Sequence, residues 1–237
     1  IDDDRSRLRV LYDRGVRVVQ LTYNGANRIG NGCAVGDKPG LTEFGREAVR
    51  EMNEIGIAVD LSHCNVQTTL DAIRLAEAPP LVTHSSCRAV FDHPRAKSDS
   101  ELAALAAADG FFAVYAVPFF LTDRQRPDFS VLIEHLKHAI EMMGIERVGI
   151  GTDWGLWSPD VPPELTRAVV EAARKMGFNR SMVGTIGTAL RGMDDYTDWI
   201  VVTRALVGAG FDDSEIAALL GGNYLRYLDR LERNAER

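Results

Sequence analysis

The sequence predicts an α/β fold built around a parallel β-sheet. Short apolar runs rich in β-branched and aromatic residues alternate along the chain with longer amphipathic stretches. The apolar runs show no regular polar alternation, which is typical of strands that are covered on both faces. Five such runs are predicted as strands, at residues 16–22, 57–61, 81–83, 111–117 and 148–151.

The stretches between and after these runs have the features of helices. Thr42 is suited to cap a helix over 42–55, and Ser98 or Ser100 is suited to cap another that runs to residue 108. A Gly-Gly pair separates the last two predicted helices, because glycine is a poor helix former. The other predicted helices cover residues 66–76, 129–144, 163–175, 195–208, 213–220 and 223–234.

The number of strands bears on the architecture. Five strands and a long helical tail use all 237 residues, whereas a (β/α)8 barrel has eight strands and usually needs about 250 residues. Two architectures fit: an open doubly wound sheet, or a barrel that lacks its first strands. The chain begins with Ile1 rather than Met, and its first residues are unlike a signal peptide. We therefore expect a single (β/α)8 barrel domain over 1–237, incomplete because an N-terminal segment is missing, with the helical segment 195–237 packed on the barrel.

Composition excludes several classes of protein. The formal net charge is −7 and no basic run occurs, so nucleic acid is a poor candidate partner. No apolar run is long enough for a membrane span. Three cysteines without a CxxC pair argue against a disulfide framework and a zinc–thiolate site. We expect a cytoplasmic protein, with a periplasmic or secreted location left open.

Polar residues follow several predicted strands at the point where each strand ends. Tyr23 and Asn24 follow the first strand, His63 the second, His84 the third and Asp153 the fifth. In a parallel α/β fold these ends lie on one rim, where active sites form. Imidazole is the commonest metal ligand near neutral pH, and Asp supplies a hard oxygen or a general base. The sequence therefore predicts a metal site, and two histidines with a carboxylate suit zinc.

Other polar residues have plainer interpretations. Arg95 follows a proline in the loop after the third strand, where a guanidinium can grip a substrate carboxylate, although a surface arginine is the simpler interpretation. His135 and His138 lie in a helical stretch and are expected on the solvated surface. Cys64 and Cys87 are expected to be small buried residues. No GxGxxG, GxxxxGK[ST] or GxSxG pattern occurs, which argues against a nucleotide loop and a serine-hydrolase elbow.

Longer segments resemble a known family. They are LTYNGANRIGNG, GLTEFGREAVREMNEIGIAVDLSHCN, PPLVTHSSCRAVFDHPRAKSD, VGIGTDW and LLGGNYLRYLDRL. Their order and spacing over nearly the whole chain resemble the membrane (renal-type) dipeptidase family, which is zinc peptidase family M19, and a bacterial-like member in particular. The resemblance implies a (β/α)8 barrel that holds two zinc ions bridged by a carboxylate and a water.

The resemblance also implies roles for single residues. His63 and His84 would be ligands of one zinc, and Asp153 the acid/base residue in the attack of a metal-bound hydroxide on a dipeptide. Arg95 would face the terminal carboxylate of the substrate. The family's other ligands, a His-x-Asp pair and a bridging glutamate, would lie before this chain begins. Relatives are often dimers, so a homodimer is expected.

Tyr23 departs from the pattern of the mammalian enzymes, which carry a histidine at this position. A tyrosine hydroxyl still donates a hydrogen bond, so Tyr23 or Asn24 is expected to steady the developing oxyanion. Two other functions stay open from the sequence. One is a catalytically degenerate barrel that serves as a binding or assembly module, and the other is an amidohydrolase that acts on a non-peptide amide or a lactone.

Overall fold

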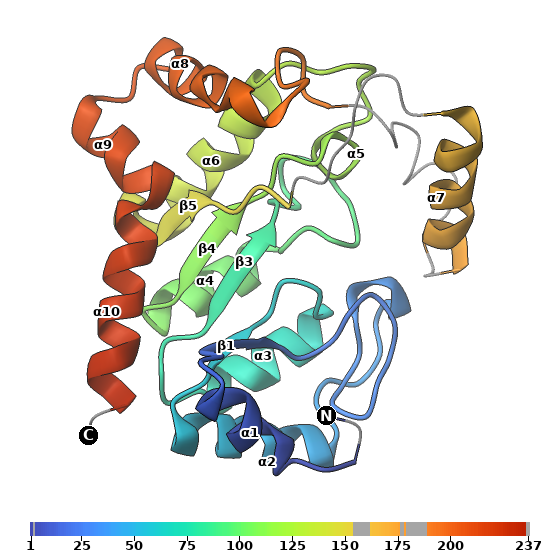
Figure 1. Cartoon of the computed structure of the whole chain (residues 1–237), viewed down its shortest axis with the longest axis vertical. Helices are drawn as coiled ribbons and strands as arrows, with labels where there is room; N and C mark the ends of the chain where they lie inside the picture. Colours follow the sequence, from blue (N-terminus) through green and yellow to red (C-terminus); the bar gives the residue numbers. More distant parts are fainter. Residues whose placement is uncertain (2, 154–161, 176–177, 179–188, 236–237) are drawn as a thin grey trace.

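A computed structural model of the chain describes all residues except 2, 154–161, 176–177, 179–188 and 236–237. In this described part, five parallel strands form one sheet, and each strand pairs with the next along the chain (Figure 1). This sequential order is that of a (β/α) barrel wall, whereas a doubly wound sheet reverses direction at a switch point. The predicted α/β fold is confirmed. The strands are β1 (Val18–Gln20), β2 (Ala58–Asp60), β3 (Leu81–Ser85), β4 (Phe111–Val114) and β5 (Val148–Ile150).

Most helices lie in the ranges that the sequence predicts, and only the short first and fifth helices were not predicted. The helices of the described part are α1 (Arg7–Asp13), α2 (Glu43–Ile55), α3 (Val66–Leu75), α4 (Asp99–Ala107), α5 (Pro118–Leu121), α6 (Ser130–Met143), α7 (Pro163–Lys175), α8 (Ile200–Gly208), α9 (Asp213–Ala217) and α10 (Asn223–Ala235). The Thr42 hydroxyl caps α2 by accepting from the Gly45 amide. Ser98, rather than Ser100, caps α4 and forms a capping box with Glu101. None of the helices in the described ranges is both long and apolar enough to cross a bilayer.

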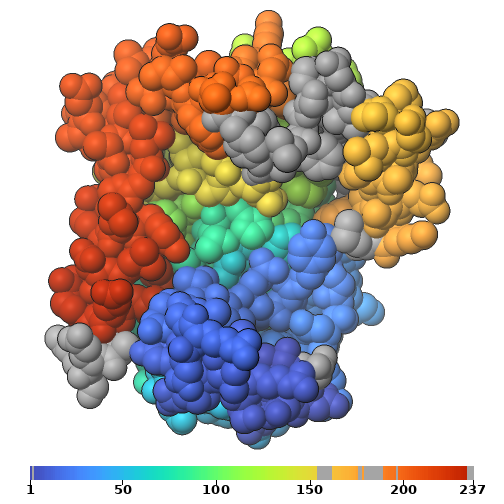
Figure 2. Space-filling view, in the orientation of Figure 1, coloured from blue at the N-terminus to red at the C-terminus, as the bar shows by residue number. Residues whose placement is uncertain are grey.

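The two faces of the sheet pack against different partners. Alternate strand residues point to opposite faces, so Phe112 joins the large core while Phe111 joins a second, smaller cluster. Helix α10 closes this smaller cluster through Tyr227 and Leu231, and the Tyr227 hydroxyl donates to the Pro79 carbonyl at 2.7 Å. In Figure 2, atoms from the middle of the chain, in green and teal, are visible between the N-terminal part, in blue, and α10, in red. Helix α10 thus covers part of this face of the sheet.

His135 corrects one expectation from the sequence. It is fully buried, not solvated, and it links α6 to two loops. The Cys87 amide donates to its Nδ1 at 3.0 Å, so its Nε2 carries the hydrogen and donates to the Leu121 carbonyl at 3.0 Å. Burial lowers the pKa of His135 to about 4. His138, by contrast, is partly exposed and lies 2.8 Å from Asp99.

The buried His135 predicts a loss of stability in mild acid. Below its ordinary pKa of 6.5 the unfolded chain binds a proton at His135, whereas the folded protein binds it only near pH 4. Stability should therefore fall as the pH drops from 6.5 toward 4, by about 3 kcal/mol from this residue. Urea unfolding of the wild type and of His135→Gln at several pH values measures this, and the variant should show the shallower dependence. Equal slopes would contradict the assignment.

Candidate metal centre

The structure brings the two predicted histidine ligands together. His63 follows β2 and His84 lies in β3, the next strand of the sheet. Their Nε2 atoms are 2.9 Å apart, and the ring planes meet at 63°. Both side chains are largely buried, so burial lowers the pKa of each ring, and the charge of Arg95 lowers it further. Both imidazoles are therefore neutral at pH 7, which is the form that binds metals.

The tautomer of His63 follows from its partner. Its Nδ1 lies 2.7 Å from Oδ1 of Asn24, which is 2% exposed. An amide oxygen only accepts hydrogen bonds, so the hydrogen of this neutral ring is on Nδ1. The Nε2 of His63 therefore carries a lone pair.

The tautomer of His84 follows from a longer chain of contacts. Its Nδ1 lies 2.7 Å from Oγ1 of Thr83, whose hydroxyl donates to Oδ2 of Asp60 at 2.7 Å. A hydroxyl has one hydrogen, so Thr83 accepts from His84 and the ring hydrogen is again on Nδ1. The two Nε2 lone pairs thus face each other, and a shared cation removes their repulsion. The pair fits two of the four positions around a zinc ion.

Further ligands are not found near this pair. No third His, Cys, Asp or Glu joins it within the residues that the structure describes. Asp153 lies just after β5, is exposed, and has a φ of +48°, a left-handed conformation that aspartate tolerates better than most residues. Its charge opposes the lowering of the pKa of His84, which places it within electrostatic reach of that ring. Asp153 therefore lies near the pair without completing a cluster of ligands.

Arg95 occupies a different position from the one expected for a surface arginine. It is 1% exposed, and its guanidinium donates to the main-chain carbonyls of Ser62 and of His84, the latter at 3.1 Å. These contacts hold the ends of β2 and β3 together beneath the imidazoles. The expected contact of Arg95 with a substrate carboxylate stays a prediction.

Tyr23 and Asn24 are neighbours in the chain but differ in exposure to solvent. Tyr23 is 57% exposed, and its ring stacks on His63 with a centroid distance of 4.4 Å. Asn24 is buried behind His63, and its Oδ1 also accepts from the Cys33 thiol at 3.3 Å. Tyr23 is thus accessible from solvent, whereas the described contacts of Asn24 orient the ring of His63.

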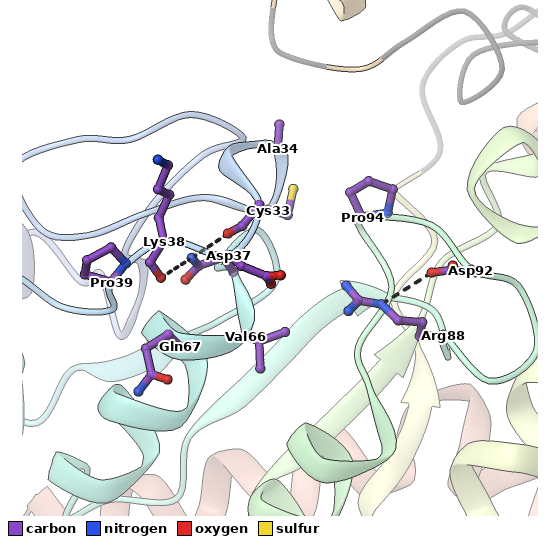
Figure 3. A pocket seen from close by; sticks show the side chains of 12 residues that line it. Cys33, Ala34, Asp37, Lys38, Pro39, Val66, Gln67, Arg88, Asp92 and Pro94 are labelled. Atoms are coloured by element: carbon purple, nitrogen blue, oxygen red, sulfur yellow. Dashed lines mark hydrogen bonds and ion pairs between the residues drawn. The ribbon is translucent and has the colours of Figure 1, made fainter.

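A cavity of about 760 Å³ is lined in part by Cys33. Figure 3 shows its two walls, one formed by the loop around Lys38 with the start of α3, the other by the loop from Arg88 to Pro94. Arg88 forms an ion pair with Asp92 at 3.8 Å in the second wall. Cys33 connects the cavity with the metal site, because its thiol contacts the amide that orients His63.

Sequence reasoning missed the residues behind the two rings. Asp60 and Thr83 were assigned only to strands, and Cys33 was considered only for disulfides and thiolate ligands. A carboxylate inside an otherwise apolar strand was the available signal for Asp60, because burying a charge is costly unless it is hydrogen-bonded. No comparable signal marks Thr83, since threonine is common in strands.

Comparisons with known proteins confirm the family that the sequence resembles. Residues 1–169 match the family described as membrane dipeptidase, peptidase family M19. The dipeptidase verJ of Clonostachys rogersoniana is 31% identical over 229 residues, which are 95% of this chain and 51% of that protein. The chain thus spans about half the length of this curated relative, and 37% of a Schizosaccharomyces pombe protein named as an uncharacterized dipeptidase.

Solved structures agree as well. The crystal structure of an amidohydrolase from Pseudomonas aeruginosa superposes with a TM-score of 0.84 at 28% identity, covering 97% of this chain and 69% of that one. A structure described as dipeptidase AC, a metallopeptidase of family M19, superposes with a TM-score of 0.76 at 25% identity, covering 94% and 59%.

Fold and comparisons together define the class of protein: an α/β protein with a barrel-type parallel sheet, similar to metallopeptidases. The chain belongs to the membrane dipeptidase family, peptidase family M19.

Gly151 provides a test of how closely the strand ends pack. A Cβ at this position would lie 1.7 Å from the Thr83 carbonyl oxygen and 2.9 Å from the Ala113 Cβ. Gly151→Ala should therefore push the end of β5 away from β3 and destabilise the protein by about 1–3 kcal/mol. Gly208→Ala is the matched control, because its Cβ would meet nothing within 4 Å. Chemical denaturation of both variants measures the difference, and equal stabilities would contradict the close approach.

Proposed function

We propose that the protein is a zinc-dependent dipeptidase in which His63 and His84 bind one zinc ion through their Nε2 atoms. The observation that supports this most is the facing of two neutral, buried imidazoles across 2.9 Å at adjacent strand ends. Family membership supports the peptide substrate. The remaining ligands of a two-metal centre would come from outside the described residues. Zinc at such a centre supplies a nucleophile at neutral pH by lowering the pKa of bound water toward 7.

The residues of this chain divide the other tasks. Asp153, exposed beside His84, is proposed to take the proton of the attacking water and to pass it to the leaving nitrogen. The ring of Tyr23 stacks on His63, and its hydroxyl is proposed to donate to the substrate carbonyl oxygen. Arg95 is proposed to contribute a positive charge that attracts the terminal carboxylate. A cytoplasmic location and a homodimer stay predictions.

One finding favours a second function. The Pseudomonas aeruginosa structure with the TM-score of 0.84 is described as an amidohydrolase. The same histidine pair and carboxylate suit hydrolysis of a non-peptide amide, because the attacked group is again a carbonyl. Substrate choice would then depend on Tyr23 and the surrounding loops.

The proposed acid/base residue is tested by Asp153→Asn in the full natural protein. Turnover of dipeptides should fall by about 10²–10⁴-fold, because the amide accepts no proton, while the zinc content stays that of the wild type. Steady-state assays with zinc-loaded protein measure this against a panel of dipeptides, a non-peptide amide and a lactone. Asp213→Asn, an exposed change on α9, is the control.

Unchanged turnover in Asp153→Asn would remove the acid/base assignment. Cleavage of the non-peptide amide alone would favour the amidohydrolase. If the zinc-loaded wild type cleaved none of these compounds, a binding module would remain.

A further inference from the structure

Asp60 is a buried carboxylate whose acceptor sites are used by neutral groups. It is 4% exposed, and its Oδ1 accepts from the Ser62 amide at 3.0 Å, the Ser62 hydroxyl at 2.5 Å and the Thr83 amide at 3.2 Å. Its Oδ2 accepts from the Thr83 hydroxyl at 2.7 Å. No ion pair to Asp60 occurs in the part of the chain that the structure describes. Burying a charge without a counterion is costly, so the presence of a carboxylate at this position calls for an explanation other than stability.

Thr83 passes the effect of this carboxylate to His84. Its hydroxyl hydrogen is used by Asp60, so only its lone pair is left for the ring nitrogen 2.7 Å away. The backbone of His84 is tied to the same group, because its amide donates to the Ser62 hydroxyl at 3.1 Å. The ring of His84 is thus held to the Asp60 carboxylate through the Thr83 hydroxyl, and the main chain of His84 is held to it through the Ser62 hydroxyl.

We propose that Thr83, anchored by Asp60, is a positioning residue that keeps the ring hydrogen of His84 on Nδ1 and turns its Nε2 lone pair toward His63. The nitrogen that binds a metal is set by the hydrogen bond that the other nitrogen makes. Without the Thr83 hydroxyl, His84 can shift its hydrogen to Nε2 and donate it to the Nε2 of His63, 2.9 Å away. This tautomer closes the gap between the rings and leaves the Nε2 of His84 without a lone pair for a cation between them.

The positioning role rests on the proposed function, because it serves the zinc site, but the tautomer of His84 can be measured without zinc. In metal-free protein labelled with ¹⁵N-histidine, two-dimensional NMR correlations through the ring bonds show which nitrogen of His84 carries the hydrogen. The wild type should show it on Nδ1, and Thr83→Val, which keeps the shape but lacks the hydroxyl, should lose this state. Thr83→Ser restores the hydroxyl and should restore the tautomer.

Zinc affinity is the second readout, measured by competition with a chromophoric chelator. Thr83→Val should bind zinc about 10–100-fold more weakly than the wild type, and Thr83→Ser should recover most of this loss. Thr68→Val is the control: Thr68 is buried, whereas Thr83 is half-buried, and the Thr68 hydroxyl likewise donates a hydrogen bond, to the Asn31 carbonyl. It should lose stability without a change in tautomer or zinc affinity.

The outcomes separate the two claims. A wild-type His84 with its hydrogen on Nε2, or a Thr83→Val protein with unchanged tautomer and affinity, would overturn the positioning role. The expected tautomers in a protein that binds no zinc would support the positioning role and overturn the proposed metal site instead.

Discussion

Two neutral imidazoles face each other across 2.9 Å at the ends of neighbouring strands, and the surrounding contacts hold them in this position. Lone pairs repel at such a distance unless a cation or a proton lies between them. Asn24 fixes the first ring and Thr83 the second, each from the side opposite the gap. These contacts therefore disfavour the alternative tautomer, in which the Nε2 of one ring donates a hydrogen bond to the Nε2 of the other.

The charges around the pair are buried, and this has an energetic cost. Arg95 lies beneath both strand ends, and Lys97 donates to the Cys64 carbonyl at 2.9 Å while pairing with Glu101 at 3.2 Å. Apolar residues would pack here at lower cost, because desolvating ions is expensive. What these cations add is a fixed hold on main-chain carbonyls next to His63 and His84. Burial, and after it the positive charge of Arg95, keep both rings neutral, and the neutral ring is the form that binds a metal.

Much of this fold was predictable because its signals are local. Apolar runs predict the strands and Thr42 predicts a helix start, since each depends on a few adjacent residues. The pairing of His63 with His84 was predictable because parallel strands bring their carboxyl ends to one rim. The family that the sequence resembles is confirmed by the match of residues 1–169, whereas the metal ligands stay a prediction.

Other features depend on contacts between distant segments and could not be predicted. The burial of His135 follows from a loop folding back onto α6, and nothing near His135 in the sequence marks it. Helix α1 was missed because it is short and buries only Leu8. Arg95 looked like a surface residue because its two carbonyl partners carry no sequence signal: one belongs to Ser62, just after β2, and the other to His84 in β3.

X-ray absorption at the zinc edge tests the central claim most directly, because imidazole ligands give a recognisable scattering pattern. The zinc-loaded protein should show at least two imidazole nitrogens at about 2.0–2.1 Å. His63→Ala and His84→Ala should each lower the number of imidazoles per zinc or abolish binding. A spectrum without imidazole, or one that neither substitution changes, would contradict the account.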